Sequence, residues 1–260
     1  MFTRMQAVFV LSASLLTGLA HAEKYEQRLP VQPHGMVEIS NVAGRIEVQG
    51  WDNPEVEVRG DIGEGVEKVD FATDHGHTII KVRVPNHSFH SASADLRIRV
   101  PRDSELDISG VSSEVVVANV EGELMAKTVS GNVRADVFGR DTEIKTVSGD
   151  MTLRLSPSHS IRLRSTSGDI GLEGKLTKGG NIDAETVSGE LTVRASHEGG
   201  LDYQVNTFSG DIKNCMGLDS ERVSKYGPGR RLNGTRGEGA DQARIRLKTM
   251  SGDVELCDKT

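Results

Sequence analysis

The sequence contains six copies of one short motif. They are Thr128-Val-Ser-Gly-Asn132, Thr146-Val-Ser-Gly-Asp150, Ser165-Thr-Ser-Gly-Asp169, Thr186-Val-Ser-Gly-Glu190, Thr207-Phe-Ser-Gly-Asp211 and Thr249-Met-Ser-Gly-Asp253. Successive copies are 18, 19, 21, 21 and 42 residues apart, and the last step is twice 21. A period near 20, with a glycine in each unit, is typical of a stacked β-solenoid.

Apolar residues alternate with polar ones on both sides of each motif glycine. Around Gly149, for example, they stand at Ile144, Met151 and Leu153. This period-2 pattern predicts two short strands per copy, whose shared apolar face only stacking would bury. We therefore predict an all-β fold, a single-stranded parallel β-helix that is right-handed and has rungs of about 18–21 residues. Its corners are the glycines Gly131, Gly149, Gly168, Gly189, Gly210 and Gly252.

The chain divides into three parts. Residues 1–22 predict a cleavable signal peptide, because Arg4 precedes an apolar run that ends in the small-residue pattern Ala20-His-Ala22. Residues 23–108 hold a weaker copy of the motif at Gly44 and strands ended by prolines, which predicts an irregular β cap with the first rungs. Residues 109–260 form the regular solenoid, and Ser113 takes the place of glycine in its first rung.

Composition narrows the classes of partner. The formal net charge is −7, so we expect neither nucleic acid nor an anionic membrane surface to attract the protein. No stretch after the signal peptide is apolar enough to predict a transmembrane helix. Only 4% of residues are aromatic and 29 are glycine, which suits a narrow interior of small aliphatic side chains.

The long last step contains a segment without alternation. Residues 219–239, the basic segment, are rich in glycine, so we interpret the 42-residue step as one rung plus a loop insertion. On an acidic chain this segment predicts a ligand-binding loop for an anionic partner such as an acidic polysaccharide. Its basic residues are Arg222, Lys225, Arg230, Arg231 and Arg236.

Two features of the corners allow more than one interpretation. The serine before each glycine is the same in all six copies and predicts an internal hydroxyl ladder. The residues after the glycines would stack as an acidic column. This column either binds calcium as a ladder of carboxylates or is structural, because Asp and Asn suit the position beside a corner glycine. We favour the structural role, since a basic column runs beside the acidic column and compensates its charge. Any bound ion would lie near Glu190 and Asp211. The acidic column is Asn132, Asp150, Asp169, Glu190, Asp211 and Asp253, and the basic column includes Lys127, Lys145, Arg164 and Lys248.

Two histidine pairs occur in the cap, His75-Gly-His77 and His87-Ser-Phe-His90. Metal ligation needs converging side chains, but turn residues flank both pairs and no third ligand is spaced to complete a site. Solvated loop histidines are the favoured interpretation, and we predict no metal or other cofactor.

Two stretches carry a family resemblance. One runs from Val37 to Val58 and includes Asn-Val-Ala-Gly-Arg-Ile-Glu-Val; the other is the set of Thr-Val-Ser-Gly-Asp copies, ending with Ile245 to Leu256. Together they resemble the bacterial "putative adhesin" family of exported β-helix domains. The resemblance covers nearly the whole chain after residue 22 and implies the fold, but it brings no catalytic motif.

The chain has two cysteines, and both occupy the same register. Cys215 and Cys257 each lie five residues after their motif glycine. If the basic segment is a loop, they stand on adjacent rungs about 4.8 Å apart, within the range of a disulfide, which an oxidising compartment would preserve. We predict a Cys215–Cys257 disulfide.

These observations predict an exported, non-catalytic protein with an adhesin-like binding or scaffolding role in the cell envelope, in the periplasm or at the cell surface. Nucleophile-elbow, phosphate-loop and zinc motifs are missing from the sequence. The alternative is a carbohydrate-active β-helix enzyme, a polysaccharide lyase or hydrolase, which needs a lateral groove whose acids break the repeat. A structural spacer is a third interpretation.

Overall fold

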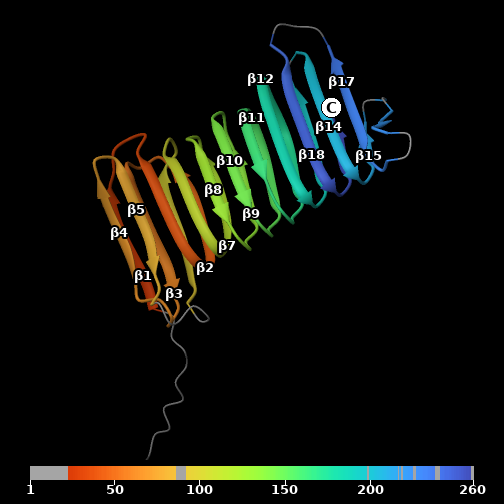
Figure 1. Ribbon diagram of the computed structural model, residues 1–260. Helices are drawn as coiled ribbons and strands as arrows, with labels where there is room; N and C mark the ends of the chain where they lie inside the picture. The colour runs from red at the N-terminus through yellow and green to blue at the C-terminus, as the bar shows by residue number, and fades with distance from the viewer. Residues whose placement is uncertain are drawn as a thin grey trace, which may run out of the picture.

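The computed structural model of the chain describes residues 23–85, 92–197, 199–215, 217, 219–224, 227–237 and 241–258. The predicted signal peptide therefore lies outside the described residues. All regular elements within them are β-strands, which stack side by side in one elongated body (Figure 1). Across these residues no helix is long and apolar enough to cross a bilayer.

The repeats form a solenoid of two parallel ladders. One ladder holds the strands before each corner, in the spatial order β8 (Leu124–Thr128), β10 (Asp141–Thr146), the second halves of β11 (Met151–Arg164) and β12 (Ile170–Ser188), β18 (Ala243–Ser251) and β14 (Leu201–Ser209). The other holds the strands after each corner: β9 (Val133–Val137), the first halves of β11 and β12, β13 (Leu191–His197), β19 (Val254–Cys257) and β15 (Ile212–Asn214). The prediction of an all-β solenoid is confirmed, and its right-handed coil stays a prediction.

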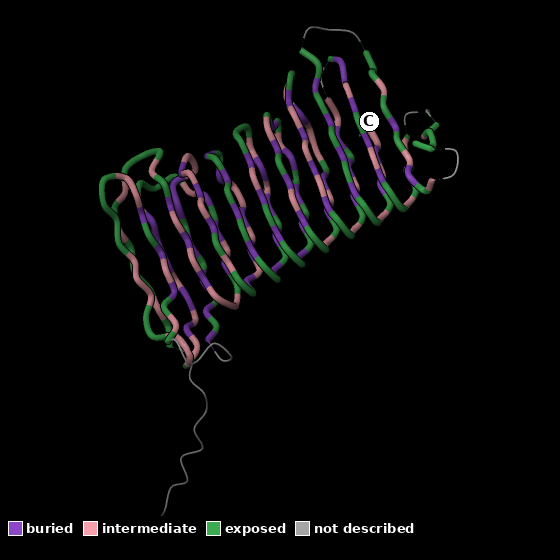
Figure 2. The backbone as a smooth tube through the Cα atoms, viewed as in Figure 1, coloured by how far each residue is buried: buried purple, intermediate pink, exposed green. Residues whose placement is uncertain are grey.

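The core lies between the two ladders. The apolar positions of each repeat are buried, with Ile170 1% and Leu191 0% exposed, whereas Arg154 and Arg194 face solvent. Buried residues alternate with more exposed ones along the strands of the two ladders (Figure 2). Mostly Val, Ile, Leu and Ala fill this interior, and Tyr203 is its largest fully buried side chain.

Close stacking explains why each corner has a glycine. A Cβ on Gly149 would lie 2.1 Å from the carbonyl oxygen of Gly131 in the neighbouring rung, and one on Gly189 would lie 2.2 Å from that of Gly168. No side chain fits at such distances. Most of these corners therefore need glycine because the next rung approaches closely, and not because the backbone adopts an unusual φ.

The prediction that the motif serines form an internal ladder is wrong. The serines directly before the six glycines are exposed, and the residues two positions earlier, five threonines and Ser165, are buried instead. Thr146 Oγ1 donates to the carbonyl of Gly149 (3.0 Å), and Thr207 Oγ1 donates to that of Gly252 (3.1 Å). The alternation that buries the apolar residues continues to the threonine, and the bend at the glycine turns the serine outward.

The acidic column has a structural role. Four of its six side chains accept a hydrogen bond from the backbone N–H of their counterpart in the next rung: Asp150 N–H donates to Asn132 Oδ1 at 2.9 Å, and Asp169 N–H donates to Asp150 Oδ1 at 3.0 Å. Bonds of the same kind join Glu190 to Asp169 and Asp211 to Asp253. These bonds favour the corner role over an ion ladder. No cluster of metal-ligating side chains occurs in the described residues.

The N-terminal strands close one end of the solenoid. The first rung in sequence, β2 (Met36–Trp51), pairs with β7 (Glu105–Val120) on one side and with β5 (His77–Arg83) and β6 (Ala94–Pro101) on the other. Three strands then add in antiparallel fashion: β3 (Glu55–Ile62) on β6, β1 (Glu23–Pro30) on β3, and β4 (Lys68–Asp74) on β5. They cover the open edge at this end. The boundary expected at residues 108–109 falls inside β7.

The C-terminal rungs do not stack in sequence order, which corrects the expected stacking. The last repeat of the chain, β18 and β19, inserts between the rung of β12 and β13 and the rung of β14 and β15 (Figure 1). The basic segment, expected as a loop, contains two strands, β16 (Glu221–Arg222) and β17 (Arg230–Arg236). Since β17 pairs antiparallel with β14, it covers the outer edge of the last rung.

Glu57 in the cap leads to a prediction on stability. Its side chain is 2% exposed, and its carboxylate lies 2.5 Å from Arg28, 3.4 Å from Arg59 and 3.6 Å from Arg99. We expect Glu57→Ala to lower the free energy of unfolding by about 2–3 kcal/mol. Removing one partner of a buried ion pair costs more than that, but these arginines are about half exposed.

Denaturant unfolding measures this effect. The matched control is Glu47→Ala, at an exposed position on β2, with an expected loss below about 0.5 kcal/mol. Equal losses in the two variants would contradict the role of Glu57 in the cap.

Candidate functional site

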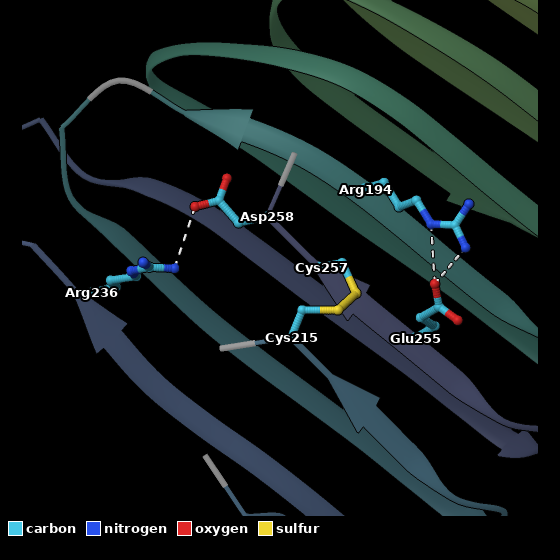
Figure 3. The surroundings of a disulfide bond; sticks show 6 residues. All are labelled: Arg194, Cys215, Arg236, Glu255, Cys257 and Asp258. Atoms are coloured by element: carbon cyan, nitrogen blue, oxygen red, sulfur yellow. Dashed lines mark hydrogen bonds and ion pairs between the residues drawn. A yellow bond between two sulfur atoms is a disulfide. The ribbon is translucent and has the colours of Figure 1, made fainter. Parts of the chain in front are cut away.

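The structure separates the basic residues predicted as a binding loop. Arg222 is exposed on β16, and Arg230, Arg231 and Arg236 lie on β17. Lys225 lies outside the described residues. Arg230 Nε lies 3.0 Å from Asp211 Oδ1, whereas Arg236 is paired with Asp258 at the other end of β17, near the disulfide (Figure 3). The structure therefore brings Arg230 and Arg231 together and places Arg236 elsewhere.

A pocket of about 450 Å³ lies where the ends of β14 and β18 meet the segment before β17. Four apolar residues contribute to it: Phe208 from β14, Met250 from β18, and Val223 and Pro228 from the basic segment. We call it the Phe208 pocket. Its volume falls within the range of small-molecule sites. The cations Arg230, Arg231 and Lys248 complete its lining, together with Asn206, Thr207, Ser224, Gly227, Gly229 and Thr249.

The apolar side chains of this pocket are exposed to solvent. Phe208 is 60% exposed, Val223 57% and Met250 53%. Single exposed apolar residues are common, but three that line one hollow make it a candidate binding surface. The sequence contained a signal for two of them, because the position two before the motif glycine carries its largest side chains, Phe and Met, in the last two copies.

The three cations of the pocket differ in how they are neutralised. Lys248 Nζ lies 2.6 Å from Glu185 Oε1, and Arg230 is paired with Asp211. Within the described residues, Arg231 has a neutral partner: its Nε donates to Asn206 Oδ1 at 2.9 Å. Arg231 is thus the cation best placed to meet an anionic ligand at the pocket.

A second hollow, of about 240 Å³, lies along the edge of β7, β8, β10 and β11 and is acidic. Its carboxylates follow the repeat: Glu105, Glu123 and Asp141 form one column across the rungs, and Asp107 and Glu143 belong to the next. The Lys145 side chain, as a hydrogen-bond donor, lowers the pKa of Glu143. A general acid needs the opposite shift.

The histidine pairs do not form a site in the described region. His75 Nδ1 lies 2.5 Å from Asp74, and His77 Nε2 lies 3.3 Å from Glu38 on β2. The two rings therefore have separate carboxylate partners. His87 and His90 lie outside the described residues.

The sixfold motif and the two stacked ladders agree with one family model. The model of Toastrack DUF4097 matches residues 24–179 and 158–257. The chain belongs to this family. No curated protein matches this Toastrack chain.

Several solved structures resemble this Toastrack chain. One is a "putative adhesin" from Bacteroides fragilis, at 12% identity and a TM-score of 0.48, covering 92% of this chain and 100% of the other. A "putative lipid binding protein" from Parabacteroides distasonis matches at 13% identity and 0.48, covering 91% and 97%. A "putative cell adhesion protein" from Clostridium sporogenes matches at 10% identity and 0.41, covering 91% and 100%. Two of these names agree with the "putative adhesin" resemblance of the sequence.

Proposed function

We propose that this protein is an exported, non-catalytic binding protein of the cell envelope and that it captures an anionic ligand at the Phe208 pocket. The signal-peptide pattern of residues 1–22 supports export. The observation that carries the binding role is the position of Arg231 beside three exposed apolar side chains. An acidic polysaccharide is the first ligand to test, because the basic segment predicts that class.

The alternative, a carbohydrate-active enzyme, has less support. It requires carboxylates that break the repeat, with one held protonated near neutral pH. The acidic hollow has carboxylates in register, and the pKa of Glu143 is lowered. The Phe208 pocket has no carboxylate among its described lining residues.

We expect polygalacturonate to bind the wild-type protein and Arg231→Ala to weaken that binding about fivefold, the effect of one exposed charge contact. Binding should also weaken as salt rises from 20 to 300 mM, because salt screens an exposed cation. Isothermal titration calorimetry measures both effects.

The matched control is Arg154→Ala, which removes an exposed cation from the other ladder and should leave affinity unchanged. Binding that ignores both salt and Arg231→Ala would place the ligand elsewhere.

A further inference from the structure

A stripe of exposed side chains leads away from the Phe208 pocket along the corner of the solenoid. It consists of the residue two before each corner, in the spatial order Val111, Val129, Val147, Thr166, Val187, Met250 and Phe208. Backbone hydrogen bonds link neighbouring members, from Ser130 N–H to Val111 O and from Ser148 N–H to Val129 O. The strand register places Met250 between Val187 and Phe208. The stripe is apolar except at Thr166.

The stripe changes character at the C-terminal end. From Val111 to Val187 its members are small, and they become large at Met250 and Phe208. Val223 and Pro228 line the same pocket as the two large side chains. The register of β14 and β18 places Met250 and Phe208 on neighbouring strands, and the inserted order leaves β14 at the outer edge, where β17 pairs with it.

Ion pairs neutralise most of the cations near the stripe. Lys145 pairs with Glu143 at 2.5 Å and Arg164 with Asp183 at 2.9 Å, and at the pocket Lys248 and Arg230 are paired with Glu185 and Asp211. At the pocket, Arg231 instead faces the neutral Asn206. An apolar floor with a cation at its rim therefore occurs at one end of the stripe.

We propose that the Phe208 pocket binds a single-chain anionic amphiphile. Its acyl chain covers Phe208, Met250 and Val223 and extends along the stripe towards Val187, and its anionic head group meets Arg231. This inference rests on the proposed binding function and adds the chemical class of the ligand. A hydrophilic polyanion would satisfy Arg231 but leave the apolar floor in water, and an uncharged chain would do the reverse.

The test uses fatty acids as probes, below their micelle concentrations, in calorimetry with the full mature protein. We expect affinity to rise about three- to fourfold per added methylene from octanoate to dodecanoate, as for a chain that enters an apolar site. Acetate should not bind measurably. Dodecyl maltoside, which has the chain without the charge, should bind about tenfold more weakly than dodecanoate.

Three variants separate the chain from the charge. Phe208→Ser should weaken dodecanoate binding at least tenfold and leave the melting temperature unchanged, because the side chain is exposed. Val129→Ser removes an exposed member of the same stripe distant from the pocket and should have no effect on affinity. Arg231→Ala should weaken dodecanoate but not dodecyl maltoside.

Several outcomes would overturn the inference. They are affinity that is independent of chain length, an equal loss in Phe208→Ser and Val129→Ser, and binding only to phosphatidylglycerol vesicles, which would indicate a membrane surface. A fourth is a dimer that Phe208→Ser dissociates while dodecanoate fails to bind the wild type, which would assign the stripe to a second copy. Polygalacturonate binding that depends on Arg231 but not on Phe208, without fatty-acid binding, would leave the proposed function intact and refute the acyl site.

Discussion

Leu153→Asp is expected to abolish cooperative folding. Leu153 is 1% exposed and stacks between Ala135 and Leu172 of the neighbouring rungs. The substitution loses about 2–5 kcal/mol of packing and transfer free energy and leaves a carboxylate unpaired between two apolar layers, which costs several more. The sum, on the order of 5 kcal/mol or above, matches the whole stability of a typical domain. Circular dichroism melting should show no cooperative transition.

The neighbouring residue supplies the control. Thr152 lies on the same strand but is exposed, and its register partners are Arg134 and Gly171. Thr152→Asp should change the free energy of unfolding by less than about 1 kcal/mol. Melting curves that treat the two variants alike would contradict the assignment of inner and outer faces.

The residues of the inner and outer faces could be predicted because side chains alternate along a strand, so one inward residue fixes the face of its neighbours. Once Ile170 and Leu191 are inside, alternation places Arg154 and Arg194 outside, and the structure agrees. The shared register of the motif glycines likewise fixes how each rung aligns with its neighbour. These two local rules account for the parallel ladders.

The order of the rungs could not be predicted in this way. Each rung presents nearly the same edge, so β18 fits on β12 as well as β14 would, and periodicity says nothing about which comes first. Arg194, on β13, pairs with Glu255 on β19 at 2.6 Å, which is a contact between two rungs 61 residues apart in the chain. The basic segment makes this order attainable, because it lets the chain return and enter between existing rungs.

The candidate site could be predicted only in part, again because the order of the rungs could not be predicted. Charge composition pointed to Arg230 and Arg231, but the apolar floor depends on which strands become neighbours. Phe208 and Met250 are 42 residues apart in sequence and would be neighbours in either order, but only the inserted order leaves an edge of β14 free to pair with β17. Val223 joins them through the fold of the basic segment, which shows no periodicity in the sequence. Sequence patterns describe one rung well and contacts between distant rungs poorly.

Removing the Cys215–Cys257 disulfide is expected to lower the free energy of unfolding by about 4 kcal/mol. The bond joins Cys215, the residue after β15, to Cys257 at the end of β19, with the two Cα atoms 4.8 Å apart, as their shared register predicts (Figure 3). It closes a loop of 42 residues that contains the basic segment and β17, and the chain-entropy estimate for that length gives this value. Cys215→Ser, Cys257→Ser and their double variant should lose similar amounts in denaturant unfolding. A loss below about 1 kcal/mol in all three would show that the bond does not constrain the unfolded chain.

A transplanted disulfide distinguishes the loss of the bond from damage by serine and also tests the rung order. Position 194 is the register partner of Cys257 in the structure. Arg194→Cys combined with Cys215→Ser should therefore form a bond to Cys257 and regain part of the lost stability. If the rungs stacked in sequence order, position 194 would lie beside Cys215, and Arg194→Cys combined with Cys257→Ser would form the bond instead. In the inserted order positions 194 and 215 lie two rungs apart, nearly 10 Å, which is too far for a disulfide. Non-reducing peptide mapping of both variants decides between the two orders.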